Sequence, residues 1–491
     1  MNRKIERAPV VGGLIAIATL LLSSCMVGPK YQRPSAPTAQ AFKEPPPSGW
    51  KTAQPSDGVL RGKWWELYND PDLNALEEQV SISNQNVLAA AAQYREAKDN
   101  IRIARAAFYP TVSVGPGITS ARESSSLISG PARTGSGVQN TFSIPFDFSY
   151  QIDVFGSIRR AIRASAETAQ ADEAQLENIR LMYQAELAQD YFSLHGLDGD
   201  EDLLERTVKS YEEYLKLTQN RYASGVASGG DLALAETQLY TTTAQLVDFN
   251  VMRTQYEHAI AILTGKPPSE LAIARKILRN APPVIPVAVP SALLERRPDI
   301  ASMERLMASA NEQIGIAQAA YYPTISLSAS AGLQGSSLLN LFSWPARFWS
   351  IGPLVSETLY DAGRRKGVLL QAEDAFDVTV ANYRQTVLTA FQQVEDALSA
   401  LHYLEDEMNV EAKAVEAAER SLTIATAQYK AGTTDYLTVI TTQALALQDE
   451  RSEVDLLTRR ITESVLLIEA LGGGWDSSQL PSTTDLMAHA K

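Results

Sequence analysis

Apolar residues recur at three- and four-residue steps over two long stretches of the chain, the pattern of a helix with one buried face. In the first stretch this spacing is carried by Leu176, Ile179, Tyr183, Leu187, Tyr191 and Leu194, the seam of a coiled coil. The stretches predict long helices over residues 156–221 and 363–429. At 1.5 Å per residue, each helix spans on the order of 100 Å. A return helix of about 35 residues follows each one, and a shorter helix supplies the remaining length.

A second pattern, strict alternation of apolar and polar residues, marks the segment FSIPFDFSYQID. Its apolar members are Phe142, Ile144, Phe146, Phe148, Tyr150 and Ile152. Such alternation predicts a strand with one face in an apolar medium and the other in water. With its neighbours it predicts β-hairpins over residues 109–153 and 322–361. The later segment FWSIGPLVSETLYD alternates less cleanly, with Trp344 and Trp349 near its start, where the aromatic belt of a membrane strand would lie.

The four predicted strands admit two interpretations. One is a small antiparallel sheet packed on a soluble core. The other is a transmembrane β-barrel, whose strands run about 9–12 residues with alternating faces. Because the smallest spanning barrels use about eight strands, the second interpretation requires the chain to oligomerise, and three copies would supply twelve strands.

The chain is internally duplicated. The segment AQYREAKDNIRIARAAFYPTVSV matches MASANEQIGIAQAAYYPTISL, with Tyr109 aligned to Tyr322, and the turns QNRYASGVASGGDL and AQYKAGTTDYL place Tyr222 and Tyr429 207 residues apart. Each copy reads as a helix that ends at a Tyr-Pro, a β-hairpin, a long helix, a turn and a return helix. This order puts the strands at one end of the molecule and both turns at the other.

The duplication sets the predicted domain boundaries. The first repeat covers residues 62–280 with its turn at 222–231, a linker covers 281–298, the second repeat covers 299–475 with its turn at 430–437, and a flexible tail covers 476–491. The turns contain four glycines that permit a tight reversal of the chain: Gly225, Gly229, Gly230 and Gly432. We name these two segments the tip turns.

The N-terminus has the layout of a secretory signal peptide over residues 1–24, with positive charges, an apolar run and then small residues. The run ends in LSSC, which resembles a bacterial lipobox, so we expect Cys25 to be acylated and to become the first mature residue. The proline-rich residues 25–61 are expected to run extended along a surface. No later segment offers 18 consecutive apolar residues, which excludes a transmembrane helix from the mature chain.

Composition and charge exclude several function classes. The formal net charge of −14 without a basic cluster makes nucleic acid an unsuitable partner. The single cysteine excludes an internal disulfide, and the four histidines never fall at metal-ligand spacing. The segment LTGKPP lacks the upstream glycine of a phosphate-binding loop. No Ser-His-Asp or paired-carboxylate arrangement stands out, so we expect no catalytic residue, no metal and no cofactor.

The motifs VGPKYQRP after the cysteine, WWELYNDPDLNAL, the paired FYPTVSV and YYPTISL, and the paired tip turns resemble the outer-membrane factors of Gram-negative tripartite systems. The resemblance is to TolC-like and OprM-like channel-tunnels, in the lipoprotein branch of the drug-efflux type. It implies a mixed α+β, mainly α fold, in a homotrimer with a twelve-stranded outer-membrane barrel and a helical periplasmic tunnel. It also implies palmitate at Cys25 and a role in antibiotic resistance. The implied partners are a periplasmic adaptor and an inner-membrane transporter of the proton-driven resistance-nodulation-division type.

The resemblance also implies a gate at the tip turns. Asp231 matches the gating aspartate of the first turn and Tyr429 the gating tyrosine of the second, with Tyr222 as the repeat counterpart. Thr434 stands where the family has an arginine, and Asp435 is a second source of negative charge at the mouth. The simpler interpretation is that the two tyrosines pack the helix ends.

Three functions remain open at this stage. The first is a passive duct that carries drugs or other small amphipathic compounds across the outer membrane. The second is the outer-membrane component of a metal-efflux or type I protein-secretion system, which shares this architecture. The third is a periplasmic coiled-coil lipoprotein scaffold that forms no channel.

Overall fold

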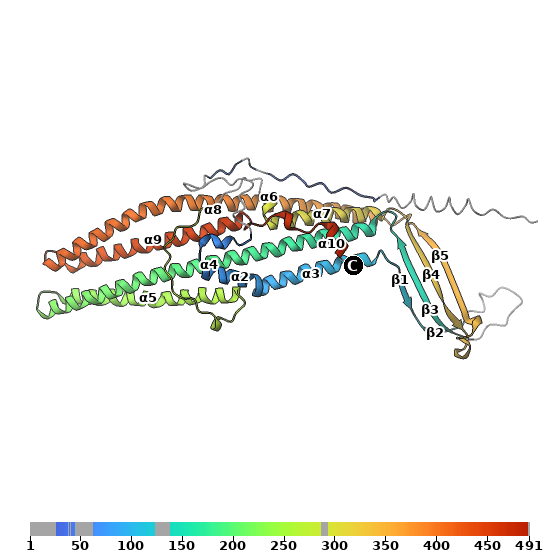
Figure 1. Cartoon of the computed structure of the whole chain (residues 1–491), viewed down its shortest axis with the longest axis horizontal. Helices are drawn as coiled ribbons and strands as arrows, with labels where there is room; N and C mark the ends of the chain where they lie inside the picture. The colour runs from blue at the N-terminus through green and yellow to red at the C-terminus, as the bar shows by residue number, and fades with distance from the viewer. Residues whose placement is uncertain are drawn as a thin grey trace, which may run out of the picture.

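The computed structural model describes residues 26–37, 39, 41–44, 62–122, 138–285 and 293–489. The predicted signal peptide and Cys25 lie outside these ranges. The molecule is elongated, with a β-sheet at one end and two helical hairpins reaching the other (Figure 1). None of the helices in these ranges combines the length and apolar character needed to cross a membrane.

Two long helices form the spine of the molecule. They are α4 (Ser157–Ala223) and α8 (Arg364–Ala431), each within about two residues of its predicted span. Each turns back into a helix of 35 residues, α5 (Gly229–Leu263) after α4 and α9 (Tyr436–Ala470) after α8. The α4–α5 and α8–α9 hairpins lie side by side through α4 and α9. The coiled-coil prediction is confirmed, because Leu187, Tyr191 and Leu194 of the predicted seam are fully buried in the main core.

Shorter helices complete the two repeats. The first repeat has η2 (Trp64–Tyr68), α2 (Pro71–Ser83), α3 (Gln85–Ala106) and η3 (Pro268–Glu270), and the second has α6 (Leu293–Arg296) and α7 (Pro298–Ala319). The predicted single helix of the first repeat is therefore divided, since Asn84 caps the start of α3 by accepting from the backbone of Asn86 and Val87. Part of the predicted linker is helical, because α6 and the first residue of α7 fall inside it.

The short helices stack end to end on the return helices, and the two joints between them have the same construction. At the first joint Asn84 Nδ2 donates to Leu263 O over 2.9 Å. At the second, Arg297 Nη1 donates to Ala470 O over 3.0 Å. Both joints contain a glycine with positive φ, Gly265 at 72° and Gly472 at 92°. These glycines are 207 residues apart, as Tyr222 and Tyr429 are. The duplication therefore extends to the joints.

The sheet is antiparallel in the order β1–β3–β4–β5, with β2 also on β3. The strands are β1 (Thr111–Val114), β2 (Gly117–Ala121), β3 (Gln139–Ile152), β4 (Thr324–Gly335) and β5 (Arg347–Ser356), and η5 (Leu338–Asn340) and η6 (Trp344–Ala346) lie between β4 and β5. Both β1 and β2 pair with β3, so they are one predicted strand interrupted at residues 115–116. Pro116 explains the interruption, because it has no N–H to donate to the ladder.

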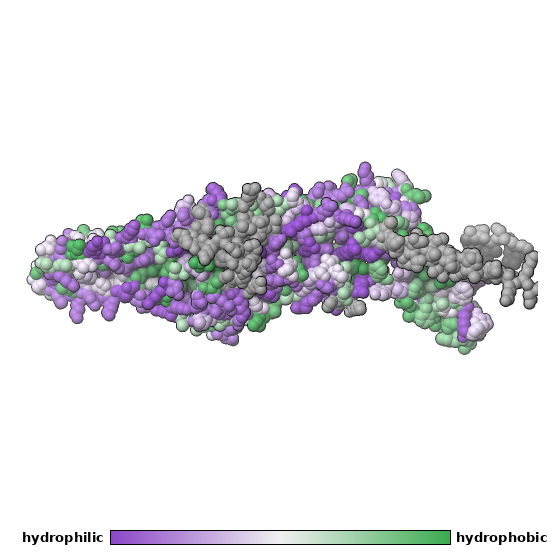
Figure 2. Space-filling model, turned by 45° about the horizontal axis from the view of Figure 1, so that its top comes forward, coloured by the Kyte–Doolittle hydropathy of each residue, from purple (hydrophilic) through white to green (hydrophobic). Residues whose placement is uncertain are grey.

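Register gives this sheet one apolar and one polar face, because directly opposed residues point to the same side. The β3–β4 pairs on the apolar face are Phe146–Ala331, Phe148–Ala329, Tyr150–Leu327 and Ile152–Ile325, and the intervening pairs Asp147–Ser330, Ser149–Ser328 and Gln151–Ser326 are polar. The outer strands largely continue the pattern, with Val112 opposite Phe148 and Ile351 opposite Ala329. Phe348 and Leu354 of β5 are apolar exceptions, because they lie on the polar face. The apolar residues of these outer strands are exposed, so the sheet does not pack on a soluble core by this face. Hydrophobic residues gather over the sheet, whereas the helical body is mostly hydrophilic on the face in view (Figure 2).

The N-terminal residues 26–44, where described, run along the helices without regular structure, as predicted. Val27 N donates to Phe155 O at the junction of sheet and helix. The buried guanidinium of Arg160 donates to Val27 O over 2.6 Å and to Pro29 O over 3.3 Å, and pairs with Glu312. These contacts attach the start of the described chain to the end of the helical body that carries the sheet.

The prediction of a flexible tail over residues 476–491 is wrong for its described part. This segment contains η7 (Ser477–Gln479) and α10 (Thr483–His489), and α10 packs against α3 and α4. Leu486 is buried in the same core cluster as Ile158. Arg105 Nη1 donates to Met487 O over 2.7 Å. Gln170 Nε2 likewise donates to Pro481 O over 2.6 Å. The polar composition of the segment gave no sign of this buried leucine or of the two main-chain acceptors that attach the segment to the bundle.

Candidate functional site

The first tip turn reverses the chain through one glycine. Gly225 has a φ of 75°, the left-handed region, and nothing lies near the position of a Cβ there. Gly229 and Gly230 are instead the first two residues of α5 and do not have positive φ. Of the predicted turn glycines on this side, only Gly225 is therefore required by backbone conformation.

Asp231 closes the start of α5 through a reciprocal capping box. Its carboxylate accepts from Ser228 N and from Ser228 Oγ, both over 2.9 Å. Ser228 Oγ in turn accepts from Asp231 N over 3.1 Å. Such a pair satisfies backbone donors that the first turn of a helix leaves free. In the described part of the chain, the hydrogen bonds of the Asp231 side chain stay within this turn.

The second tip turn has the same outline with different caps. Gly432 ends α8 with a φ of 76°. Asp435 caps α9 by accepting from Thr438 N over 3.0 Å and from Thr438 Oγ1 over 2.6 Å, and these bonds lower the pKa of Asp435. Thr434, where the resemblance expects an arginine, is half-buried between the two helices. Asp435 thus caps the start of α9, as Asp231 caps the start of α5.

The two tyrosines at the tip of the molecule, Tyr222 and Tyr429, differ in exposure. Tyr222 is 50% exposed, whereas Tyr429 is 4% exposed. Tyr429 belongs to an apolar cluster at the tip with Ala235, Tyr436, Val439 and Ile440. Its ring lies 5.5 Å from that of Tyr436, and its hydroxyl lies 3.4 Å from Thr218 Oγ1. The structure brings Tyr429 to α4 of the other hairpin and does not bond it to Asp231.

Arg221 is the tip residue that the sequence reasoning missed. Its guanidinium lies 4.2 Å from the centre of the Tyr429 ring and donates to Tyr429 O over 3.0 Å. Tyr214 makes a second contact between the hairpins, with its hydroxyl 3.0 Å from Thr426 Oγ1. The repeat contained a signal for Arg221, because the matching position in the second copy is Gln428. A charge present in only one copy of a duplicated turn indicates a task specific to that copy.

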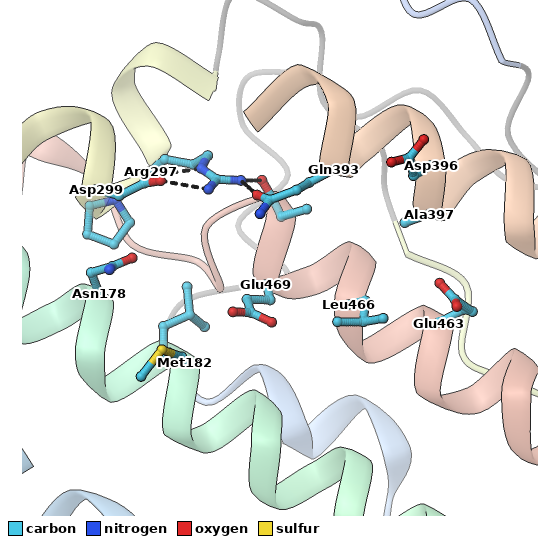
Figure 3. A pocket seen from close by; sticks show the side chains of 13 residues that line it. Asn178, Met182, Arg297, Asp299, Gln393, Asp396, Ala397, Glu463, Leu466 and Glu469 are labelled. Atoms are coloured by element: carbon cyan, nitrogen blue, oxygen red, sulfur yellow. Dashed lines mark hydrogen bonds and ion pairs between the residues drawn. The ribbon is translucent and has the colours of Figure 1, made fainter. Parts of the chain in front are cut away.

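A cavity lies at the joint between α9 and α7 (Figure 3). This cavity of about 350 Å³ is lined by four carboxylates and one guanidinium: Asp299, Asp396, Glu463, Glu469 and Arg297. Arg297 lies between Asp299 and Gln393, pairing with Asp299 over 2.7 Å and donating to Gln393 Oε1 over 2.8 Å. No group of acidic, histidine or cysteine residues in the described ranges has the arrangement of a metal site.

Glu469 is a carboxyl in this cavity whose pKa is raised strongly. Burial raises the pKa of Glu469 to about 7, and the charges of Asp299 and Glu186 add to the rise while Arg297 opposes it. A carboxyl with such a pKa changes its protonation near neutral pH. The cavity lies at the second joint, where Arg297 donates to the backbone oxygen of Ala470, the residue after Glu469.

Both repeats match the same protein-family model. The family model described as outer membrane efflux protein matches residues 76–266 and 289–473. The solvent efflux pump outer membrane protein SrpC of Pseudomonas putida is 30% identical over 464 residues, which cover 94% of this chain and 98% of that protein. The probable efflux pump outer membrane protein TtgC of Pseudomonas putida KT2440 is 29% identical over 465 residues, covering 94% of this chain and 95% of that one. Among solved structures, the outer-membrane channel OprN is similar with a TM-score of 0.84 and 27% identity, over 92% of this chain and 100% of that one.

Proposed function

The chain belongs to the outer membrane efflux protein family, and from this premise we propose that it is the passive outer-membrane duct of a tripartite pump for drugs and other small amphipathic compounds. As an outer-membrane efflux channel it is a transport component, and we expect no chemistry of its own. The observation that carries the proposal is the sheet, whose exposed apolar face suits lipid and whose polar face suits an aqueous interior.

The sheet also supports a homotrimer. In the described chain, the outer strands β1, β2 and β5 each pair on one side only. Unpaired edges carry free N–H and C=O groups that lipid cannot satisfy. Three copies that pair edge to edge would join their strands into one closed sheet and continue the two hairpins into a helical tunnel.

The N-terminal contacts support lipid anchoring in the outer membrane. Cys25, the proposed site of acylation, lies outside the described residues, but the chain that follows it is held at the junction of sheet and helix through Val27 and Arg160. An acyl group at Cys25 would therefore reach the membrane close to the sheet. Anchoring strengthens with each buried methylene of the acyl chains.

The partners that fit this architecture are a periplasmic adaptor at the tip turns and an inner-membrane transporter of the proton-driven resistance-nodulation-division type. The tip turns lie at the end of the molecule farthest from the sheet (Figure 1). We propose that they gate the duct, with Asp231, Tyr429, Tyr222, Thr434 and Asp435 at the mouth. The exposure of Tyr222 leaves its ring free for a neighbouring protomer or an adaptor.

Reconstitution of the full acylated protein in planar lipid bilayers tests the duct. We expect discrete conductance steps from the trimer, and a strain that lacks the gene is expected to lose export of small amphipathic drugs until the gene is restored. A protein that binds the membrane through its anchor but never conducts would instead be the periplasmic scaffold. Co-purification with the adaptor of a metal-efflux or protein-secretion system would point to those systems.

A further inference from the structure

The connection between β4 and β5, residues 336–346, presents large apolar side chains to the outside. It lies at the end of the sheet that is farthest from the helices (Figure 1). Four of its side chains are more than half exposed: Leu338, Leu339, Phe342 and Trp344. An exposed apolar group of this kind indicates contact with a partner rather than with water alone. We call this segment the β4–β5 connection.

The β4–β5 connection is held in one conformation by its own bonds and by two buried side chains. Ser343 Oγ donates to Asn340 O over 2.6 Å, and Ala346 N donates to Ser343 O over 3.2 Å. Leu341 and Ala346 are buried, although the residues around them are exposed. The exposed apolar side chains are therefore displayed by a segment whose inner side is already packed.

Register places one cation, Arg347, on the apolar face of the sheet at this far end. Arg347 opposes Leu333, which in turn opposes Ile144, and the next residue of β5 on this face is Trp349. Val355 stands in the last apolar row at the other end, eight residues from Arg347. At about 3.4 Å per residue and a tilt of about 40°, these rows are about 20 Å apart in height, close to the roughly 25 Å apolar band of a membrane barrel. Arg347 therefore lies near the border of the band, where a cation costs little.

The Arg347 guanidinium is stacked on a ring but keeps its donors free. Its central carbon lies 3.8 Å from the centre of the Trp344 ring. In the part of the chain that the structure describes, its nitrogens have neither a hydrogen-bond acceptor nor a carboxylate partner. A guanidinium carries five N–H donors in one plane, and an aromatic ring covers only its face. The free edge suits the oxygens of a phosphate, which accept two parallel bonds from it.

A cation at the opposite border of the sheet provides a comparison within the same molecule. Arg365 lies 5.4 Å from the centre of the Tyr321 ring, and it also pairs with Asp361 over 2.8 Å. Arg347 has the aromatic ring without the carboxylate. An anion from outside the chain would complete the contacts of Arg347 as Asp361 completes those of Arg365.

We propose that Trp344 and Arg347 form a binding site for the phosphate of an anionic lipid in the outer leaflet of the membrane, with the β4–β5 connection lying in the headgroup layer. The exposed apolar side chains of the connection continue the apolar face of the sheet, so a lipid can contact both at once. The guanidinium then donates to the phosphate oxygens at the border of that face. The site goes beyond the duct and rests on the part of the proposed function that assigns the apolar face to lipid.

The affinity of the full acylated protein for lipid A, a glycolipid with two phosphate groups, tests the site. Native mass spectrometry in a neutral detergent measures it for the wild type and for Arg347→Gln. Losing charge-assisted hydrogen bonds to phosphate is expected to weaken binding about tenfold. Arg347→Lys should fall between the two, because lysine keeps the charge without the planar fork. Arg420→Gln is the matched control, since Arg420 lies on the exposed surface of α8, and it should bind lipid A like the wild type.

Three further measurements identify the chemistry of the ligand. Dephosphorylated lipid A should bind equally to the wild type and to Arg347→Gln, because the phosphate is the group that the arginine recognises. Inorganic phosphate should not displace lipid A, since it offers nothing to the apolar surface. Trp344→Leu keeps that surface but loses the stacked ring, so it should weaken binding of lipid A about threefold. Circular dichroism and the yield of trimer check that each variant is folded.

The outcomes distinguish the lipid site from the duct. A conducting wild type with Arg347→Gln indistinguishable from Arg420→Gln in its affinity for lipid A overturns the site alone. Displacement of lipid A by inorganic phosphate also overturns it, in favour of a soluble anion. Loss of trimer from Arg347→Gln or Trp344→Leu in the absence of lipid A would assign these residues to a contact between protomers instead. A wild type that prefers phosphorylated lipid A through Arg347 but never conducts supports the site and overturns the duct.

Discussion

Asp231 illustrates how one carboxylate can hold a helix end in place before it performs any task at a gate. Its bonds to Ser228 form the capping box of α5, and the loss of such a cap costs about 1 kcal/mol. Its role in the gate is our proposal from the family resemblance. A test of Asp231 must therefore distinguish the loss of its negative charge from the loss of the helix cap. Substituting Ser228 removes the cap alone.

We expect Asp231→Ala to raise the conductance of the closed channel, because a negative charge that can bond a neighbouring helix is removed from the mouth. Ser228→Ala loses the cap but keeps the carboxylate, so it should leave the closed conductance near the wild-type value. Single-channel recording of both variants checks this. Equal increases in the two variants would assign the effect to a loosened turn and remove the Asp231 charge from the gate.

Glu469 is the other residue whose environment determines its behaviour. Its pKa in the folded protein lies near 7 because the carboxyl is buried, whereas the ordinary value of a glutamate is about 4.3. The folded protein therefore binds the proton more tightly than the unfolded chain. We therefore expect the folded state to lose stability as pH rises from about 4.5 through about 7, and to lose little more at higher pH.

Replacing the Glu469 carboxyl by an amide is expected to remove this loss of folding stability at high pH. Glu469→Gln should stabilise the protein by up to about 3 kcal/mol at pH 8 and by nothing at pH 4.5. The measurement is the thermal midpoint of helicity at several pH values. Glu416→Gln, on the exposed surface of α8, is the control and should shift the midpoint little at either pH. A Glu469→Gln gain of equal size at both pH values would contradict this account.

At the scale of elements, the decisive features are the joints where short helices meet return helices. Each long helix is matched by two shorter ones, and Asn84 and Arg297 bond the last carbonyls of α5 and α9 across the break between them. Gly265 and Gly472 then let the chain leave the joint in a conformation that other residues rarely adopt. A Cβ at Gly265 would overlap Ser83 O, and one at Gly472 would overlap Arg296 O.

The glycines of joint and tip permit a matched comparison. Gly265→Ala combines a left-handed backbone with a clash against a main-chain oxygen, so we expect it to cost more than about 3 kcal/mol. Gly225→Ala has a similar φ with open space around it, so it should cost only about 1–2 kcal/mol. Thermal unfolding followed by circular dichroism compares them. Similar losses in the two variants would show that packing at the joint is unimportant.

At the scale of the whole molecule, the two ends are built for different surroundings. The sheet carries an exposed apolar face, while the helical body buries its apolar stripes between helices. Neighbouring residues of β5 point to opposite faces of the sheet. Ile351 lies opposite Ala329 on the apolar face, and Ser350 lies opposite Ser330 on the polar one.

Lysine at these two positions tests which face meets lipid. Ile351→Lys should impair insertion, because a cation facing lipid at mid-membrane costs roughly 2–4 kcal/mol. Ser350→Lys should insert normally and alter ion selectivity, since its face would line the interior. The amount of folded trimer in isolated outer membranes gives the answer. Normal insertion of Ile351→Lys would show that the apolar face of the sheet does not contact lipid.

Much of this architecture is contained in local patterns. The heptad-like spacing around Leu187 and the alternation around Phe146 depend only on neighbours along the chain, so the long helices and the strands could be predicted closely. The interrupted helix at Asn84 and the packed segment around Leu486 could not. Both depend on what lies beside them in space, namely the carbonyl of Leu263 and the core that contains Ile158.

The sequence by itself determined the duplication, the positions of strands and long helices, and the identity of the turns, because each is encoded in periodicity and in glycine placement. Only the tertiary structure decided what the turn residues contact. It placed Tyr429 in a buried cluster and left Tyr222 exposed, although the two occupy equivalent positions in the repeats. It also placed Arg221 over Tyr429, a contact 208 positions apart along the chain. Such contacts arise from how two hairpins lie against each other, which no local pattern records.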